Sequence, residues 1–321
     1  MTTSIKWQPK DPREAFFPVE MRPLYMPTSE GLESFKALTR HFAVVDVGRE
    51  TVFSVVTDDY QLITNEEAYN KADEVMRKVF HTTKAEDMEC LNITMPKTRS
   101  FCHIDLIHKS TDFRPWEDDK WVAFLRISNS YNRTRLLRFE LGFCRWICMN
   151  GMIFGSKSVE FSYAHTRRGM NRVEGFEDNI GDIRKIEATF TEGLHQLKRY
   201  YVPQKEMLPI FCKVFDIVAT REDMKKARRV ESLTAIRDQV KGLTESYFTG
   251  LGPHGYAALN VLTDYATRPS GVIAPESSMH SLQQKASNWM ENFVSVIKKA
   301  DFSFDKYLAE YRSTAELIKS L

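Results

Sequence analysis

Arginine side chains gather between residues 126 and 172 of this 321-residue chain, where together they could bind an anionic group. The segment holds eight arginines and one lysine against two glutamates, a net charge of +7, whereas the whole chain carries +2. Guanidinium groups neutralise phosphates, and aromatic residues interleaved with them can stack on nucleic-acid bases. The segment therefore predicts an anionic partner. The residues assigned to this contact are Arg126, Arg133, Arg135, Arg138, Arg145, Lys157, His165, Arg167, Arg168 and Arg172.

Three interpretations of this basic segment stay open. It can bind nucleic acid, it can bind an acidic protein, or its arginines can be the solvated face of a sheet whose other face is buried. Salt dependence separates the first two, because phosphate contacts weaken steeply as salt rises. A protein interface with an apolar centre weakens less. Nucleic acid is the favoured partner.

Cys148 and His165 are candidates for a nucleophile and its base. A catalytic thiol needs surroundings that stabilise the thiolate, and the sequence around Cys148 supplies none, so we expect a small buried thiol there. His103 and Asp105 share one face of a predicted strand but His108 does not, which argues against a metal site. No phosphate-binding loop or hydrolase motif is found. We therefore predict a non-enzymatic protein without a metal or cofactor.

Composition places the chain among cytoplasmic proteins. Its five cysteines have no paired spacing, which favours reduced thiols. No apolar run approaches the roughly 18 residues that a membrane span needs. We expect no membrane contact, and a homo-oligomer is compatible with the sequence.

The basic segment is predicted to form antiparallel strands, because apolar and polar residues alternate along it and polar residues interrupt it. Strands are expected over residues 42–47, 52–57, 101–107, 121–127, 135–149 and 159–163. Asn-Gly is a dipeptide suited to tight turns. The residues assigned to structural turns are Asn129, Ser130, Cys148, Asn150 and Gly151.

Helices are predicted on either side of these strands. Asn65 is a plausible N-cap of an early helix. From residue 179 the chain is mainly helical, beginning with an amphipathic helix over residues 179–201. Five prolines within residues 1–31 predict an extended arm instead of a helix.

These elements predict an α+β fold, with an antiparallel sheet in the N-terminal half covered on one face by C-terminal helices. The opposite face, rich in arginine, is the expected binding surface. The expected domains are an extended proline-rich arm over residues 1–31, a mainly β core with one early helix over residues 32–175, and a helical region over residues 176–321.

The arginine-rich segment resembles the phage- and plasmid-like family known as domain of unknown function 932. The matching residues are Asn129-Ser130, Arg145, Cys148, Asn150-Gly151 and the run from Tyr163 to Arg167. Residues 55–69 and 259–268 are similar to the family's N-terminal and C-terminal elements. The chain departs from the family at Tyr131-Asn132-Arg133, where the family tends to have His-Asp-Gly.

The resemblance implies an origin in a mobile element and brings no known reaction. With the charge pattern, it leads us to expect a non-enzymatic protein that binds nucleic acid, single-stranded DNA above all, through an arginine-rich sheet face. The alternative is an anti-defence protein that binds and inhibits a host defence complex.

Overall fold

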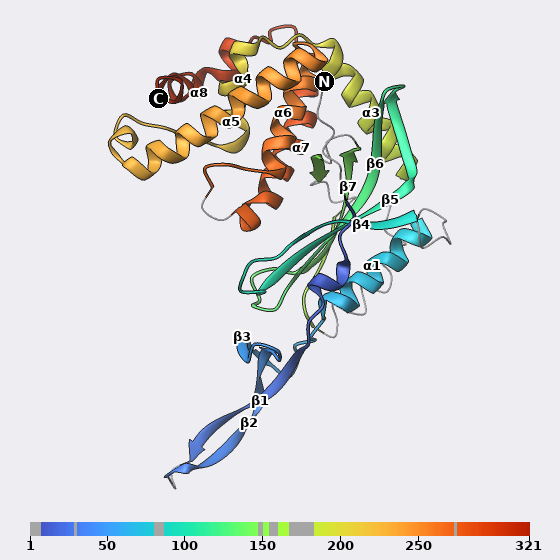
Figure 1. Cartoon of the computed structure of the whole chain (residues 1–321), viewed down its shortest axis with the longest axis vertical. Coiled ribbons are helices and arrows are strands. Elements are labelled where there is room, and N and C mark those ends of the chain that lie inside the picture. The colour runs from blue at the N-terminus through green and yellow to red at the C-terminus, as the bar shows by residue number, and fades with distance from the viewer. Residues whose placement is uncertain are drawn as a thin grey trace.

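The computed structural model describes residues 8–28, 31–79, 87–146, 150–153, 160–166, 183–272 and 275–321. The chain forms an α+β fold, as the sequence predicts, with antiparallel sheets in its N-terminal half and helices in its C-terminal half. The helices lie at one end of the molecule, and a two-stranded ribbon projects from the other (Figure 1). The domain boundary expected between residues 175 and 176 lies outside the described residues.

The main sheet contains the arginine-rich segment. Its strands are β4 (Met88–Thr94), β5 (Phe101–Trp116), β6 (Asp119–Ser130), β7 (Leu137–Arg145), β8 (Asn150–Ile153) and β9 (Glu160–Tyr163). They follow the order β4-β5-β6-β7-β8, and β9 pairs with the part of β7 that β8 leaves open. Every pairing is antiparallel. The strands expected over residues 101–107 and 121–127 are confirmed and are longer than predicted, and β9 matches the one expected over residues 159–163. Of the strand expected over residues 135–149, β7 forms Leu137–Arg145, and residues 147–149 lie outside the described ranges.

The two faces of β6 and β7 meet different parts of the chain, because successive side chains point to opposite sides of a sheet. Leu125, Ile127 and Phe139 pack in one apolar cluster with α1 (Asn65–Val79). On the other face, Arg126 donates a hydrogen bond to Gln283 of α7 (Pro275–Val296). Both faces are therefore covered here. The expectation of a solvated arginine face opposite the helices is wrong, since the apolar alternate residues require α1 to bury them.

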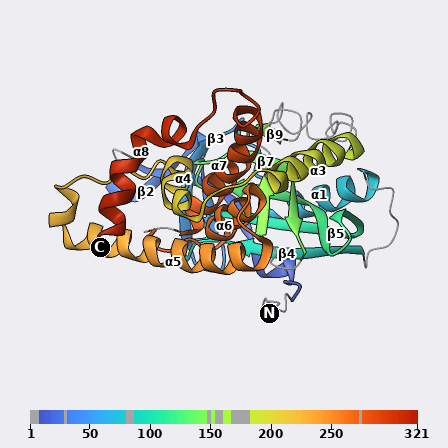
Figure 2. The ribbon, with the colours of Figure 1, turned by 90° about the horizontal axis from the view of Figure 1, so that it is seen from above.

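The other C-terminal helices pack around α7 and the far end of the sheet. They are α3 (Ile183–Arg199), α4 (Met207–Phe215), α5 (Ala227–Leu251), α6 (Gly255–Thr267) and α8 (Phe304–Lys319), with short 3-10 turns η4 (Gln204–Glu206) and η5 (Asp223–Lys225). Figure 2 shows α5 running along one side of α6. The helix expected over residues 179–201 is α3. Its stripe residues Phe190, Leu194 and Leu197 are buried as predicted.

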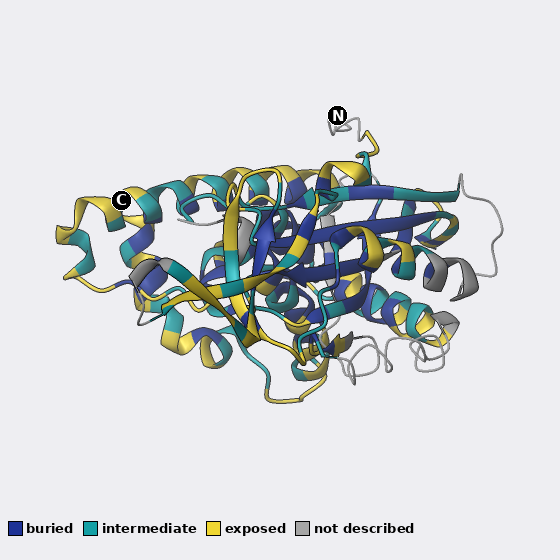
Figure 3. Ribbon diagram, turned by 90° about the horizontal axis from the view of Figure 1, so that it is seen from below, coloured by how far each residue is buried: buried dark blue, intermediate teal, exposed yellow. Residues whose placement is uncertain are grey.

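A smaller sheet carries the ribbon. Its strands are β1 (Val19–Thr28), β2 (Gly31–Asp46) and β3 (Thr51–Thr57), after the 3-10 turn η1 (Pro12–Ala15). β3 pairs only with residues 41–46 of β2, so the rest of β1 and β2 forms a two-stranded ribbon. Figure 3 shows this ribbon as mostly exposed. Pro23 and Pro27 lie in β1, an edge strand, where the missing N–H is tolerated. The boundary expected at residue 31 falls inside this hairpin.

Two buried ion pairs connect the main sheet to the helices. Arg126 is 1 % exposed and donates to both carboxylate oxygens of Asp105, each at 2.6 Å. Arg145 donates to Asp119 at 2.7 Å and to Asn260 of α6 at 3.2 Å. Burial opposes the charge of Arg126, but the adjacent Asp105 carboxylate raises its pKa, so the guanidinium stays charged. A buried charge of this kind is tolerated only with its partner.

Replacing Arg126 by Met should lower the free energy of unfolding by about 3–5 kcal/mol, because Asp105 is then left buried without a counter-charge. The double variant Arg126→Met with Asp105→Leu should recover most of that loss. Urea denaturation of both variants and the parent measures the difference. A change below about 1 kcal/mol for the single variant would contradict the role given to this pair.

Candidate functional site

The turn between β6 and β7 holds its backbone through its own polar side chains. Ser130 Oγ accepts from the Arg135 N–H at 3.1 Å and donates to the Arg135 carbonyl at 2.9 Å. Asn132 Oδ1 accepts from the backbone N–H and the hydroxyl of Thr134. Tyr131 is buried, and its hydroxyl accepts from the N–H of Asn65 at the start of α1. The turn is therefore fixed at both ends. The backbone positions from which its arginine side chains extend are fixed with it.

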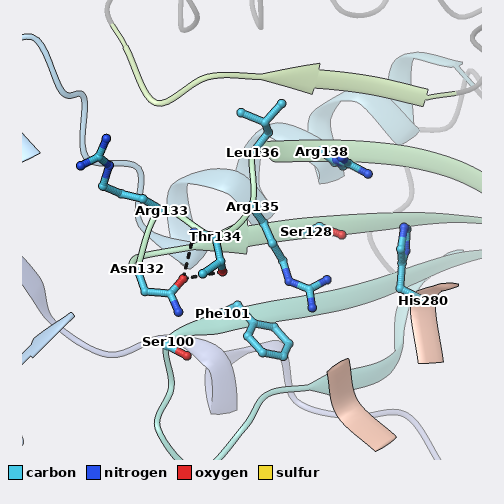
Figure 4. A pocket seen from close by; sticks show the side chains of 10 residues that line it. All are labelled: Ser100, Phe101, Ser128, Asn132, Arg133, Thr134, Arg135, Leu136, Arg138 and His280. Atoms are coloured by element: carbon cyan, nitrogen blue, oxygen red, sulfur yellow. Dashed lines mark hydrogen bonds between the residues drawn. The ribbon is translucent and has the colours of Figure 1, made fainter. Parts of the chain in front are cut away.

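A cavity of about 630 Å³ opens beside this turn (Figure 4). It combines residues of β5, β6, the turn, β7 and α7. Its lining residues are Ser100, Phe101, Ser128, Asn132, Arg133, Thr134, Arg135, Leu136, Arg138 and His280. We call it the arginine pocket, because it has three arginines and no carboxylate on its wall.

Arg135 lies across the arginine pocket in a partly dehydrated position. Its guanidinium is 4.3 Å from the centre of the Phe101 ring, and its Nη1 is 3.2 Å from Nε2 of His103. Burial lowers its pKa. Arg133 makes a long contact of 3.4 Å with the carbonyl of Val55. Within the described ranges, neither arginine forms an ion pair with a carboxylate, so both retain capacity for an anion.

Two neutral histidines stack at the pocket: His280 lines it, and His103 is buried behind His280. The rings of His103 and His280 stack with centres 5.7 Å apart and planes 7° apart. Burial, with the nearby charge of Arg126, lowers the pKa of His103 well below its ordinary value and that of His280 to about 3. Since the pair is uncharged near neutral pH, it adds hydrogen-bonding groups without adding charge.

The hydrogen bonds around these rings indicate their tautomers. Arg135 can only donate, so His103 Nε2 accepts and its Nδ1 donates to Ser128 Oγ at 2.7 Å. His280 Nε2 lies 3.4 Å from Glu140 Oε1, a position that suits a hydrogen on Nε2. The remaining nitrogen, His280 Nδ1, is buried with no hydrogen-bond partner among the residues the structure covers. The pocket thus offers arginine donors to a ligand, while His280 Nδ1 lies buried behind them.

A second, smaller cavity of about 290 Å³ adjoins the arginine pocket at the same turn. It shares Arg133, Arg135 and Leu136 with the arginine pocket. The rings of Tyr60 and His165 stack there, 5.4 Å apart and within 5° of parallel. We call it the ring cavity. Its other lining residues are Val56, Thr57, Asp59, Ala164 and Thr166.

The structure separates the predicted contact residues into three groups. Arg133, Arg135 and Arg138 line the arginine pocket, and His165 lines the ring cavity. Arg126 and Arg145 are buried in ion pairs and have no access to a surface partner, which corrects their assignment. The carboxylates of Asp105 on β5 and Asp119 on β6 draw them inward. The contact residues outside the described ranges are Lys157, Arg167, Arg168 and Arg172, and Cys148, assigned to a turn, also lies outside them.

The residues assigned to turns also divide. Asn129 and Ser130 end β6, and the Asn129 side chain donates to the carbonyl of Ile63 and to Asn65 Oδ1. Asn150 and Gly151 pair with Arg145 and Cys144 of β7. They belong to the strand β8, so the tight turn expected at that dipeptide is wrong: the ladder begins at Asn150.

Several pocket residues gave no usable signal in the sequence. His280 comes from α7, far along the chain from the sheet, and Phe101 reads as an ordinary strand residue. The sequence pattern around His103 suggests at most a metal ligand. The described residues contain no group of three side chains suited to a metal ion. None of the described helices has the length and apolarity to cross a membrane.

Comparison with protein-family models matches residues 52–289 to the family described as "Domain of unknown function (DUF932)". The matched range runs from β3 into α7 and includes both cavities, whereas β1 and β2 lie before it. No curated protein and no solved structure matches the chain.

The histidine pair should make the protein sensitive to acid. His280 has a pKa of about 3 when folded and an ordinary value of 6.5, so between these values the unfolded chain binds a proton that the folded chain does not. Stability therefore falls as the pH drops from about 6.5. Urea denaturation at pH 7, 6 and 5 should show the parent losing up to about 1.4 kcal/mol more per pH unit than His280→Asn. Equal losses in the two proteins would contradict this assignment.

Proposed function

The chain belongs to the family described as domain of unknown function 932, and from its arginine pocket we propose that it is a non-enzymatic protein that binds nucleic acid, preferably single-stranded DNA. The observation that carries the proposal is the placement of Arg133 and Arg135 on the wall of a 630 Å³ cavity without an acidic partner on that wall. Arginine in such a position is suited to phosphate, which its planar fork can contact through two N–H groups.

The shape of the pocket favours a single strand over a duplex. The arginines lie around a cavity instead of along a flat surface, and a flexible backbone can place one phosphate inside it. A duplex is stiff over many base pairs and presents its phosphates along a convex surface. Single-strand binding proteins combine such basic grooves with aromatic side chains, and Phe101 and Tyr60 line the two adjoining cavities.

We propose binding in preference to catalysis. Burial raises the pKa of the Cys90 and Cys102 thiols to about 12, so neither supplies a thiolate at neutral pH. The neutral His103 and His280 have proton affinities too low for a base that works near pH 7. A phage or plasmid origin and a cytoplasmic location belong to the same proposal, and the origin is supported only by the sequence resemblance.

The second candidate is an anti-defence protein that inhibits a host complex. The ribbon of β1 and β2 supports it, because large apolar side chains are exposed there: Tyr25 at 61 %, Phe35 at 60 % and Met26 at 49 %. Exposed apolar groups of this size are typical of protein interfaces. The ribbon also precedes the residues that match the family.

Removal of the pocket charges should weaken DNA binding without regard to sequence. Fluorescence anisotropy of a labelled single strand, at low and moderate salt, compares the parent with the triple variant Arg133→Gln, Arg135→Gln, Arg138→Gln. Each lost phosphate contact should flatten the log–log salt dependence by roughly 0.7. The effect should be similar for strands of different base composition, since phosphates carry no base identity.

A matched control removes three charges elsewhere. The control variant carries Lys225→Gln, Lys226→Gln and Arg228→Gln. These residues form an exposed basic run from the end of η5 into α5. This variant should bind as the parent does. If the folded parent fails to bind DNA at low salt, the nucleic-acid proposal is wrong and the host-protein candidate replaces it. Equal weakening by the two triple variants would mean that the arginine pocket is not the contact.

A further inference from the structure

We infer that the ring cavity is a subsite for a nucleic-acid base, next to a phosphate subsite in the arginine pocket. This inference rests on the proposed function. It concerns the base of a bound nucleotide, whereas the arginines contact its phosphate. The two cavities have Arg133, Arg135 and Leu136 in common. A nucleotide whose phosphate contacts these arginines in one cavity therefore has its own base within reach of the other cavity.

The ring cavity contains a prearranged aromatic surface. Tyr60 and His165 stack within 5° of parallel, and the Tyr60 hydroxyl lies 3.4 Å from His165 Nδ1. Backbone contacts hold the two segments together: Tyr60 pairs with Thr166, and the Gln61 N–H donates to the His165 carbonyl at 3.0 Å. Stacking on such a fixed platform stabilises a bound base regardless of its identity.

The remaining walls suit a flat heterocycle with polar edges. Val56 is buried, Leu136 is 40 % exposed, and together with Ala164 they give the cavity an apolar side. Thr57, Asp59 and Thr166 supply polar groups. The volume of about 290 Å³ is at the lower end of cavities that hold small ligands, which fits one base and not a larger group.

His165 provides an independent sign of a ligand site. The residue is 7 % exposed, and its Nε2 is buried without a hydrogen-bond partner in the part of the chain that the structure describes. Burial lowers the pKa of His165 to about 4 and raises that of Tyr60 to about 12, so the ring is neutral and the phenol keeps its proton. If Tyr60 donates to Nδ1, Nε2 carries the hydrogen. That hydrogen has no acceptor among the described residues, and a small shift of the ring would bring it to a ring nitrogen or carbonyl of a base.

Asp59 adds a preference among bases. It is exposed at the cavity, and its Oδ1 accepts a hydrogen bond from the Thr57 hydroxyl. A carboxylate can accept from the exocyclic amino group of a base, as it does from cytosine in DNA complexes. Adenine, cytosine and guanine carry such a group and thymine does not. The subsite should therefore favour amino-bearing bases over thymine.

Base stacking and strand binding can be measured separately on one oligonucleotide. A strand with a terminal dye and one internal 2-aminopurine reports overall binding by anisotropy and stacking by 2-aminopurine emission. The parent should quench that emission. Tyr60→Phe, which keeps the ring, should quench it as well. Tyr60→Leu should lose the quenching and bind about ten-fold more weakly, with an unchanged salt dependence.

Asp59→Asn gives a second test at an exposed position where the fold is not at risk. The parent should bind oligo-dC more tightly than oligo-dT, and this variant should lose most of the difference. Binding of the dye-labelled strand without any change in 2-aminopurine emission would overturn the base subsite and leave the phosphate pocket standing. Equal affinity for an intact and an abasic strand would do the same. Absence of all binding by the parent would overturn the proposed function together with the subsite.

Discussion

The guanidinium of Arg126 is buried between the sheet and α7, and its charge is tolerable there only because Asp105 lies beside it and Gln283 accepts a further N–H. This arrangement fixes where α7 sits on the sheet. His280, three residues before Gln283 on the same helix, is thereby brought over Glu140 and against the ring of His103. The inner wall of the arginine pocket is thus a consequence of the ion pair, although Arg126 itself does not line the pocket.

Much of the fold follows from local patterns in the sequence. Alternation along β6 and β7 and the stripe of α3 identify those elements, because each pattern matches one geometry of the backbone. Local patterns do not predict whether each arginine is buried in an ion pair or exposed to solvent. Arg126 pairs with Asp105 through the register of β5 and β6, and a register between two strands is set by the whole sheet. An arginine that alternates with apolar residues can therefore face a buried carboxylate as easily as solvent.

For a similar reason, the sequence predicted only some of the residues that line the two cavities. Arg133, Arg135 and Arg138 belong to one continuous segment, so their excess of charge was conspicuous. His280 reaches the same cavity from a distant helix, and Tyr60 reaches the other cavity from the loop after β3. No residue next to His280 or Tyr60 in the sequence identifies either of them as part of a site. At Asn150 and Gly151 a local signal was misleading. Their dipeptide favours a turn, but pairing with β7 makes them part of a strand.

The turn between β6 and β7 is a common wall of both cavities, and it is held by Ser130, Asn132 and Tyr131 as one unit. An occupant that displaces this unit in one cavity changes the shape of the other cavity. The two sites are then energetically linked, and linkage is reciprocal: whatever factor the first occupant imposes on the affinity of the second, the second imposes on the first. A single short turn would in this way give the protein cooperativity without an oligomer or a moving domain.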